Sequence, residues 1–391
     1  MNLTNINLNK VQAKIAILAV LAITSLQATR IYQKSMMEFM ADFPQASYLQ
    51  CTKNYCSSYA PFPLYQELAQ RFFPSRVKFD DVFILNIPNA KAYLDKSCYV
   101  FINNCFIKET QLKNLNFFYG KDFIEQDDTG DAVKIPGRVV VICNLYPSNY
   151  ALWFFDVLSQ LSLLDMHNIE YDYLCVPYFC EFMQESLDLF RIDRRKIIPL
   201  TVGMCIQADT IILPTSTSQE NNHARCANYY IDFLLNHTRK KMLDSIENID
   251  FKRDFPEKIF ISRKDSSNRR SIPNEDEVFD FFKPLGFQRY ELTKLSVAEK
   301  IALFHHAKTI VSFVGAGSTS ILFCKPKTHY IEITQKMVEA TYFFIADKLD
   351  IKYSSINDST VADLLRGSPL SSSASLSLYC VKKFLKEHPE L

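Results

Sequence analysis

Glycine is scarce in this chain, at 8 of 391 residues against the roughly 7% that is usual in proteins. Most turns must therefore form without glycine, and a place where two glycines fall close together is a candidate for a special backbone role. Charge of one sign is lacking too, because 44 Lys and Arg balance 43 Asp and Glu, and no block of like charge stands out. A dedicated nucleic-acid binder is thereby disfavoured.

Several motifs that would define other enzyme classes are also missing. The 11 cysteines include no C-x-x-C pair and no His-Cys cluster at zinc spacing, so we predict no metal site from them. No D-x-D occurs, which argues against a metal-clamped diphosphate, and no G-x-S-x-G argues against a serine hydrolase. The close pairs Cys51/Cys56 and Cys98/Cys105 would be disulfides in an oxidising compartment, or small buried hydrophobes in a reducing one.

Beyond residue 30 no apolar run approaches the length of a membrane span. Before it, residues 15–29 are uncharged and lie between Lys14 and Arg30. This segment is a signal peptide, a short anchor, or an amphipathic helix on the protein or on a membrane surface. If the segment acts as a signal peptide or an anchor, we expect the protein to be membrane-associated or to lie in a secretory, Golgi-type lumen. Otherwise we expect a cytoplasmic location.

The chain is 48% hydrophobic and long enough for two ordinary domains. From residue 139 short β-branched runs alternate with apolar helical stretches up to about residue 214, and the alternation restarts at residue 258. Strands that are apolar on both faces and separated by helices are typical of a parallel sheet covered on both sides. The sequence therefore predicts an α/β protein with two Rossmann-like domains that face each other across a cleft.

We expect five segments along the chain. They are the N-terminal segment 1–30, a variable region 31–135, an N-terminal Rossmann-like domain 136–250, a C-terminal Rossmann-like domain 257–355, and a tail with a final helix, 356–391.

Gly315 and Gly317 lie between an expected strand, 309–314, and an expected helix, 315–323. At such a turn glycine lets the backbone approach a ligand, and free amides together with the helix dipole favour an anion such as a diphosphate. Neither a Walker loop nor the third glycine of a dinucleotide fingerprint is present. The alternative is a tight turn that is needed only for packing.

A basic loop follows the expected strand 258–263 and holds Arg263, Arg269 and Arg270. Guanidinium groups at a strand end are suited to bind phosphate oxygens bidentately. Ligands of parallel sheets bind outside the carboxyl ends of the strands, where Arg263 is expected.

Several motifs, in order along the chain, resemble glycosyltransferase family 61, which includes animal O-linked N-acetylglucosaminyltransferases and plant xylosyltransferases. They are the S-R-x(5)-R-R-x-I-x-N-E-x-E signature at 262–277, the G-F strand at 286, the G-A-G turn at 315–317, and a strand ending in E-I at 333. Residues 149–156, NYALWFFD, are similar to the family segment N-Y-[YF]-H-W-L-x-D. The resemblance covers about residues 139–355.

This resemblance implies a GT-B-like enzyme whose first Rossmann-like domain binds the acceptor and whose second binds the donor. The donor would be a nucleotide sugar, expected to be a UDP-sugar, and the acceptor a hydroxyl of a glycan or protein. Transfer would be inverting, with no obligatory metal or other cofactor.

The resemblance also implies roles for individual residues. Arg263 and either Arg269 or Arg270 would hold the donor diphosphate, and Glu332 would accept hydrogen bonds from ribose hydroxyls. The remaining donor contacts would come from the amides of Gly315, Ala316, Gly317, Ser318 and Thr319.

On the acceptor side, Asp156 would be the general base or would orient one. Asn149 and Trp153 would lie beside the acceptor. Three residues depart from the family pattern, since Leu152 and Val314 replace histidines and Ser320 replaces an asparagine. A catalytically inactive relative that binds a nucleotide sugar or glycan is therefore the alternative function, and a structural protein with no ligand is a further one.

Overall fold

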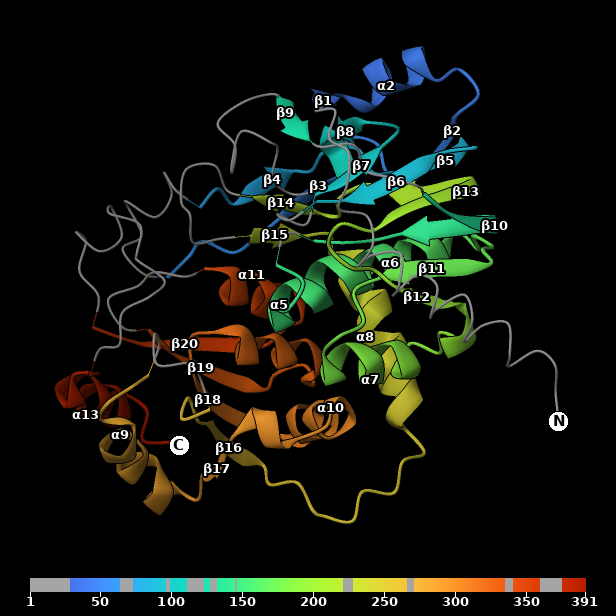
Figure 1. Cartoon of the computed structure of the whole chain (residues 1–391). Helices are drawn as coiled ribbons and strands as arrows, with labels where there is room; N and C mark the ends of the chain where they lie inside the picture. Colours follow the sequence, from blue (N-terminus) through green and yellow to red (C-terminus); the bar gives the residue numbers. More distant parts are fainter. Residues whose placement is uncertain are drawn as a thin grey trace, which may run out of the picture. The chain divides into compact units, whose positions relative to one another are not determined.

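The computed structural model describes residues 29–63, 73–95, 99–110, 123–126, 132–144, 146–220, 228–265, 271–334, 340–358 and 375–391. The chain forms two compact units. Unit 1 combines Met1–Tyr55 with Asp80–Thr217, and unit 2 combines Cys56–Phe79 with Ser218–Leu391. Each unit is organised around a sheet (Figure 1).

Unit 2 contains a five-stranded sheet in the order β17-β16-β18-β19-β20, and every neighbouring pair is parallel. Numbered along the chain, this order is 2-1-3-4-5, the flavodoxin-like arrangement. Its strands are β16 (Lys258–Ile261), β17 (Gln288–Tyr290), β18 (Thr309–Phe313), β19 (His329–Thr334) and β20 (Lys352–Asn357).

Helices cover both faces of this sheet, as the apolar alternation requires (Figure 1). The helices are α8 (Asp232–Ile246), α9 (Glu275–Phe282), η5 (Lys283–Leu285), η6 (Leu292–Lys294), α10 (Val297–His306), η7 (Ala316–Phe323), α11 (Thr341–Lys348) and α13 (Leu378–Glu387). Phe260, Val311 and Ile331 project from one face of the strands into a core shared with α9 and α13. A capping box begins α10, because the Ser296 hydroxyl accepts from Glu299 N and the Glu299 carboxylate accepts from Ser296 N.

Two antiparallel strand pairs complete unit 2: β3 (Cys56–Ser58) with β4 (Arg76–Lys78), and β14 (Ser218–Glu220) with β15 (Asn228–Tyr230). Residues 56–79 join this unit although they precede most of unit 1 in the sequence. Aromatic packing explains the attachment, since the Tyr59 ring lies 5.0 Å from Phe344 of α11 and 5.2 Å from Tyr229 of β15, centroid to centroid.

Unit 1 has a mixed sheet whose parallel part runs β12-β11-β10-β13, or 3-2-1-4 along the chain. The remaining strands extend it beyond β13, where β5 and β6 pair antiparallel. The strands are β1 (Thr29–Lys34), β2 (Ser47–Gln50), β5 (Phe83–Pro88), β6 (Lys91–Leu94), β7 (Val100–Ile102), β8 (Cys105–Ile107), β9 (Phe123–Gln126), β10 (Val133–Val141), β11 (Tyr173–Val176), β12 (Ile197–Pro199) and β13 (Cys205–Pro214).

The helical segments of unit 1 are α2 (Met36–Asp42), η1 (Lys108–Thr110), α5 (Tyr150–Leu152), η2 (Trp153–Val157), α6 (Leu158–Met166), α7 (Glu181–Leu189) and η3 (Arg194–Lys196). The apolar helical stretch at 150–166 consists of three successive segments, α5, η2 and α6, of which η2 is a π-helix. An α/β architecture with two Rossmann-like sheets is confirmed, whereas the expected cleft between the domains stays a prediction.

The predicted segment boundaries need two corrections. Residues 31–135 are not a separate region, because β5 and β6 hydrogen-bond directly to β13. Helix α8, expected at the end of the first domain, belongs to unit 2, where Arg239 Nη2 donates to the carbonyl oxygen of Cys324 at 2.8 Å. In both cases contacts distant in sequence decide the unit, and local periodicity carries no information about them.

The N-terminal stretch 15–29 lies almost entirely outside the described residues, so its alternatives stay predictions. Among the ranges that the structure does describe, no helix is long and apolar enough to span a bilayer. Cys51, Cys56 and Cys105 are free thiols, and Cys98 lies outside the described part of the chain.

Candidate functional site

The sequence-predicted basic loop and glycine turn meet at the carboxyl edge of the unit 2 sheet. Strands β16 and β18 are neighbours, and the chain order of the sheet reverses between them. Arg263 comes two residues after β16, and Gly315 comes two residues after β18. In open α/β sheets this switch point is where ligands bind.

Arg263 and Gly315 are in direct contact. A Cβ atom built on Gly315 would lie 2.8 Å from Cζ of Arg263, which is closer than real Cβ contacts. Only glycine therefore allows the guanidinium group to lie against the turn. The structure brings together the two features that the sequence singled out separately.

A buried carboxylate fixes the backbone that carries Arg263. Glu275, at the first position of α9, is 2% exposed and accepts a hydrogen bond from the Arg263 amide at 2.8 Å and another from the Ser262 hydroxyl. Arg289 Nη1 lies 3.7 Å from the same carboxylate. Glu275 thus ties the end of β16 to the amino end of α9, where the helix dipole also favours an anion.

The turn itself is packed on its other side. A Cβ on Gly317 would lie 3.0 Å from Cδ1 of Leu292 in η6. Because the Ser318 amide donates to the Gly315 carbonyl oxygen at 2.9 Å, the amides of Ala316 and Gly317 have no partner within η7. These two donors are the groups of the turn that are suited to an anion.

The contacts predicted for Ser318 and Thr319 need correction. Both residues are 0% exposed, and their amides lie inside the hydrogen-bonded part of η7. The Ser318 side chain is instead part of the protein interior, since its hydroxyl is hydrogen-bonded to the Tyr330 hydroxyl at 2.7 Å. The predicted donor contacts of the turn are thus limited to residues 315–317.

Glu332 likewise does not lie where ribose hydroxyls could reach it. It is 0% exposed, and its two carboxylate oxygens accept from the Tyr330 hydroxyl at 3.1 Å and from the Tyr353 hydroxyl at 2.8 Å. Burial, and next the Glu332 charge, raise the pKa of Tyr330, so this tyrosine remains a donor. The chain Glu332–Tyr330–Ser318 anchors the beginning of η7 to β19.

Four further residues bear on this edge, of which Arg269, Arg270 and Val314 were named from the sequence. Arg269 and Arg270 lie outside the described residues, so their roles stay predictions. Val314, which replaces a family histidine, continues the β18 pairing, because its amide donates to the Ile333 carbonyl oxygen at 3.0 Å. His305 does not substitute for it, since its Nδ1 lies 2.9 Å from the Phe323 carbonyl oxygen at the far end of η7.

Asp156 lies in unit 1, in the π-helical segment η2. The segment closes with the Leu158 amide donating to the Trp153 carbonyl oxygen, five residues back. Such π-turns are rare and occur frequently at functional sites, because they change the direction of a side chain within a helix. Asp156 is 9% exposed, and its role as base stays a prediction.

Asn149 and Trp153 have structural roles that the sequence reading missed. The Asn149 side-chain oxygen caps α5 by accepting from the amides of Ala151 at 2.9 Å and Leu152 at 3.2 Å. Trp153 is 0% exposed, and its indole N–H donates to the Ser186 hydroxyl at 2.7 Å. The placement of Trp153 beside an acceptor is therefore wrong, because the ring is enclosed between η2 and α7.

Glu275 and Tyr330 are the site residues that sequence reasoning missed. Glu275 is the first acid of the N-E-x-E motif in the sequence. An acid at the amino end of a helix is favoured by the helix dipole alone, so the motif gives no reason to assign Glu275 to a site. Tyr330 gave no signal beyond its position in an apolar strand. Together these residues hold an arginine and two free amides at one switch point, an arrangement that can bind an anion with two or more oxygens.

Comparisons with known proteins give one informative match. No curated protein matches the chain. Among solved structures, Escherichia coli heptosyltransferase WaaC with ADP is similar at 11% identity and a TM-score of 0.34, over 65% of this chain and 98% of that one. The dodecameric iron-containing heptosyltransferase TibC, in complex with ADP-D-beta-D-heptose, is similar at 11% identity and a TM-score of 0.29, over 66% of this chain and 77% of that one. At these TM-scores neither likeness carries an argument.

The family comparison is specific. Residues 150–331 match the model of the family described as Glycosyltransferase 61. The match begins at the first residue of α5 and ends within β19, so it includes Asp156, Arg263 and the glycine turn. The ordered motifs and this match agree, and over residues 150–331 the chain is similar to glycosyltransferase family 61.

Proposed function

We propose that this glycosyltransferase moves a sugar from a nucleotide-sugar donor, expected to be a UDP-sugar, to a hydroxyl of a glycan or protein with inversion at the sugar carbon. The observation that carries the proposal is the contact of Arg263 with Gly315 at the β16/β18 switch point. A guanidinium group and the amides of Ala316 and Gly317 belong to this one switch point, a combination that suits a diphosphate.

The chemistry assigns one task to each part of this site. As the sugar leaves, negative charge grows on the diphosphate, and preorganised donors stabilise it. Arg263 supplies positive charge for this purpose, and Glu275 keeps its backbone in place through the 2.8 Å bond. The acceptor hydroxyl must lose its proton to a base, for which Asp156 is our candidate. No step in this scheme requires a metal ion.

Titration calorimetry with UDP, ADP and GDP, followed by UDP-sugars, tests donor binding. Arg263→Ala should weaken UDP binding by about 10- to 100-fold, because it removes a charge-assisted, bidentate contact. Arg195→Ala is the matched control, since Arg195 is 82% exposed on unit 1 and paired with Asp193. Equal UDP affinity in the wild type and Arg263→Ala would contradict the assignment.

Turnover separates transfer from the alternative function. Donor binding with no hydrolysis or transfer to any acceptor would favour an inactive nucleotide-sugar or glycan binding module, as the replacements Leu152 and Val314 allow. In an active enzyme, Asp156→Asn should lower kcat by about 10²- to 10⁴-fold with donor affinity unchanged, which is the range expected for a general base.

A further inference from the structure

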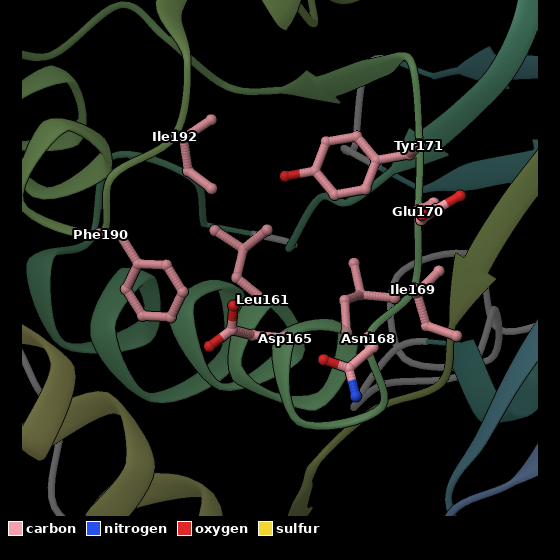
Figure 2. Close-up of a pocket in the computed structure, with 9 residues that line it drawn as sticks. Leu161, Asp165, Asn168, Ile169, Glu170, Tyr171, Phe190 and Ile192 are labelled. Atoms are coloured by element: carbon pink, nitrogen blue, oxygen red, sulfur yellow. The ribbon is translucent and has the colours of Figure 1, made fainter.

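Unit 1 contains a cavity of about 330 Å³ at the amino edge of its parallel strands. It lies between the last turns of α6 and α7 and the two connections that lead into β11 and into η3 with β12 (Figure 2). The acceptor chemistry of a Rossmann-like sheet belongs to the opposite, carboxyl edge. This cavity is therefore separate from the proposed transfer site.

The two helices that border the cavity end in the same way. Asn168 after α6 and Arg191 after α7 adopt positive φ angles of 50° and 61°. The next residue in each case reaches back into its helix, with the Ile169 amide donating to Leu164 O and the Ile192 amide to Leu187 O, both at 2.9 Å. These are Schellman-type ends.

Both helix ends make the cavity electrically negative. Each carries the equivalent of roughly half a negative charge, from the aligned peptide dipoles. Asp165 and Glu170 add two carboxylates to the lining, whereas the described lining residues include no Lys or Arg. Lys196 lies beside Tyr171, since its Nζ donates to the Tyr171 carbonyl oxygen at 2.8 Å and lies 5.2 Å from the centroid of that ring, and Arg194 binds Asp188.

The walls of the cavity combine aliphatic and aromatic side chains with polar ones. The lining is Leu161, Leu164, Asp165, Asn168, Ile169, Glu170, Tyr171, Phe190 and Ile192. Figure 2 shows the Tyr171 ring reaching over the cavity with its hydroxyl directed toward Ile192 and Leu161. Burial, with a smaller contribution from the nearby Asp165 charge, raises the pKa of Tyr171. The Phe190 ring and the aliphatic residues suit an apolar body, and the two carboxylates with the helix ends suit a cation.

We propose that this cavity binds a small organic cation, a primary ammonium group on an aromatic or branched aliphatic body. The apolar part would lie against Leu161, Ile169 and Phe190. The ammonium group would lie near Asp165 and the ends of the two helices. The volume suits a ligand at the lower end of the size range of small-molecule sites, which starts at about 300 Å³.

Three probes of similar shape and different charge test this assignment by calorimetry on the full chain. They are phenethylammonium, 2-phenylethanol and 3-phenylpropanoate. We expect phenethylammonium to bind with a Kd of about 1 mM or below, the alcohol at least about tenfold more weakly, and the anion not at all. Equal binding of all three, or no binding of the ammonium at about 10 mM, would overturn the proposal.

Variants locate the binding to the cavity. Asp165→Asn should weaken phenethylammonium binding about fivefold or more, and Ile192→Trp, which fills the space from its half-buried rim, should abolish it. Glu170→Gln serves where Ile192→Trp fails to fold, and thermal unfolding identifies that case. Glu181→Gln, an exposed acid at the opposite end of α7, is the control. The assignment of binding to this cavity would be contradicted if phenethylammonium bound equally well to the wild type, to Asp165→Asn, and to Ile192→Trp or its substitute Glu170→Gln.

Discussion

The carboxyl edges of the two parallel arrays use buried polar groups for different purposes. In unit 2, Glu275 and Tyr330 hold the Arg263 loop and the glycine turn, which are the parts that we propose bind the donor. In unit 1, Ser186 receives the indole N–H of Trp153 and thereby joins two helices. A buried polar side chain therefore indicates a binding site only when it is hydrogen-bonded to residues that follow the end of a strand.

The largest expected effect comes from removing the support of Arg263. Glu275→Ala leaves the Ser262 hydroxyl and the Arg263 amide without their acceptor, which should cost about 3 kcal/mol of unfolding free energy. UDP affinity should fall as well, because the Arg263 loop loses its anchor. Urea unfolding and calorimetry measure the two effects. Glu277→Ala, an exposed acid two residues along, is the control, and an equal loss in both variants would contradict the role of Glu275.

The second prediction concerns the contact at the turn. Gly315→Val places a side chain where the Arg263 guanidinium lies, so the arginine must move. We expect UDP affinity to fall about 10- to 100-fold, with a stability cost of about 2 kcal/mol from overpacking. Gly203→Ala in unit 1 is the control, because nothing lies within 4 Å of its Cβ position. Its backbone at φ 81° is strained by the change, yet UDP binding should be unaffected.

A matched pair of tyrosine variants separates anchoring of the turn from burial of Glu332. Tyr330→Phe and Tyr353→Phe each remove one hydrogen bond to this carboxylate and should each cost about 1 to 2 kcal/mol. Only Tyr330 also binds Ser318 of η7. The KM for the donor should therefore rise in Tyr330→Phe alone. If both variants raised it equally, Glu332 itself would be acting on the donor, as the family resemblance first suggested.

The smallest effect is expected in unit 1. Asn149→Ala removes the cap of α5 and should lower the unfolding free energy by about 1 kcal/mol. The KM values for donor and acceptor should stay within about twofold of the wild type. Ser148→Ala is the control, because Ser148 precedes Asn149 and does not cap α5. A selective rise in acceptor KM would show that Asn149 contacts the acceptor after all.

Much of unit 2 follows from its sequence. The apolar runs at 258–263, 309–314 and 329–333 each contain a strand of the parallel sheet, and Ser296 with Glu299 marks the start of α10. Local patterns suffice there because each element is continuous in sequence and buried on both faces. They also place Arg263 and Gly315 at strand ends, from which their proximity follows.

The burial of individual side chains could not be predicted in this way. Glu332 and Ser318 sit among residues whose pattern does not tell a ligand-facing side chain from one facing the next element. Their direction depends on Tyr330, which lies on the same strand as Glu332, and on Tyr353 of the neighbouring strand β20. In unit 1 the π-turn at Trp153–Val157 similarly interrupts a helix that periodicity treats as continuous. Contacts of this kind are set by tertiary packing.

A double-mutant cycle of Arg263→Ala and Gly315→Val, read as UDP affinity by calorimetry, tests the central claim that both residues serve one diphosphate. If the introduced valine side chain acts by displacing the guanidinium group, the double variant should bind UDP within about twofold of Arg263→Ala alone. Losses that multiply, as for two independent sites, would contradict the account.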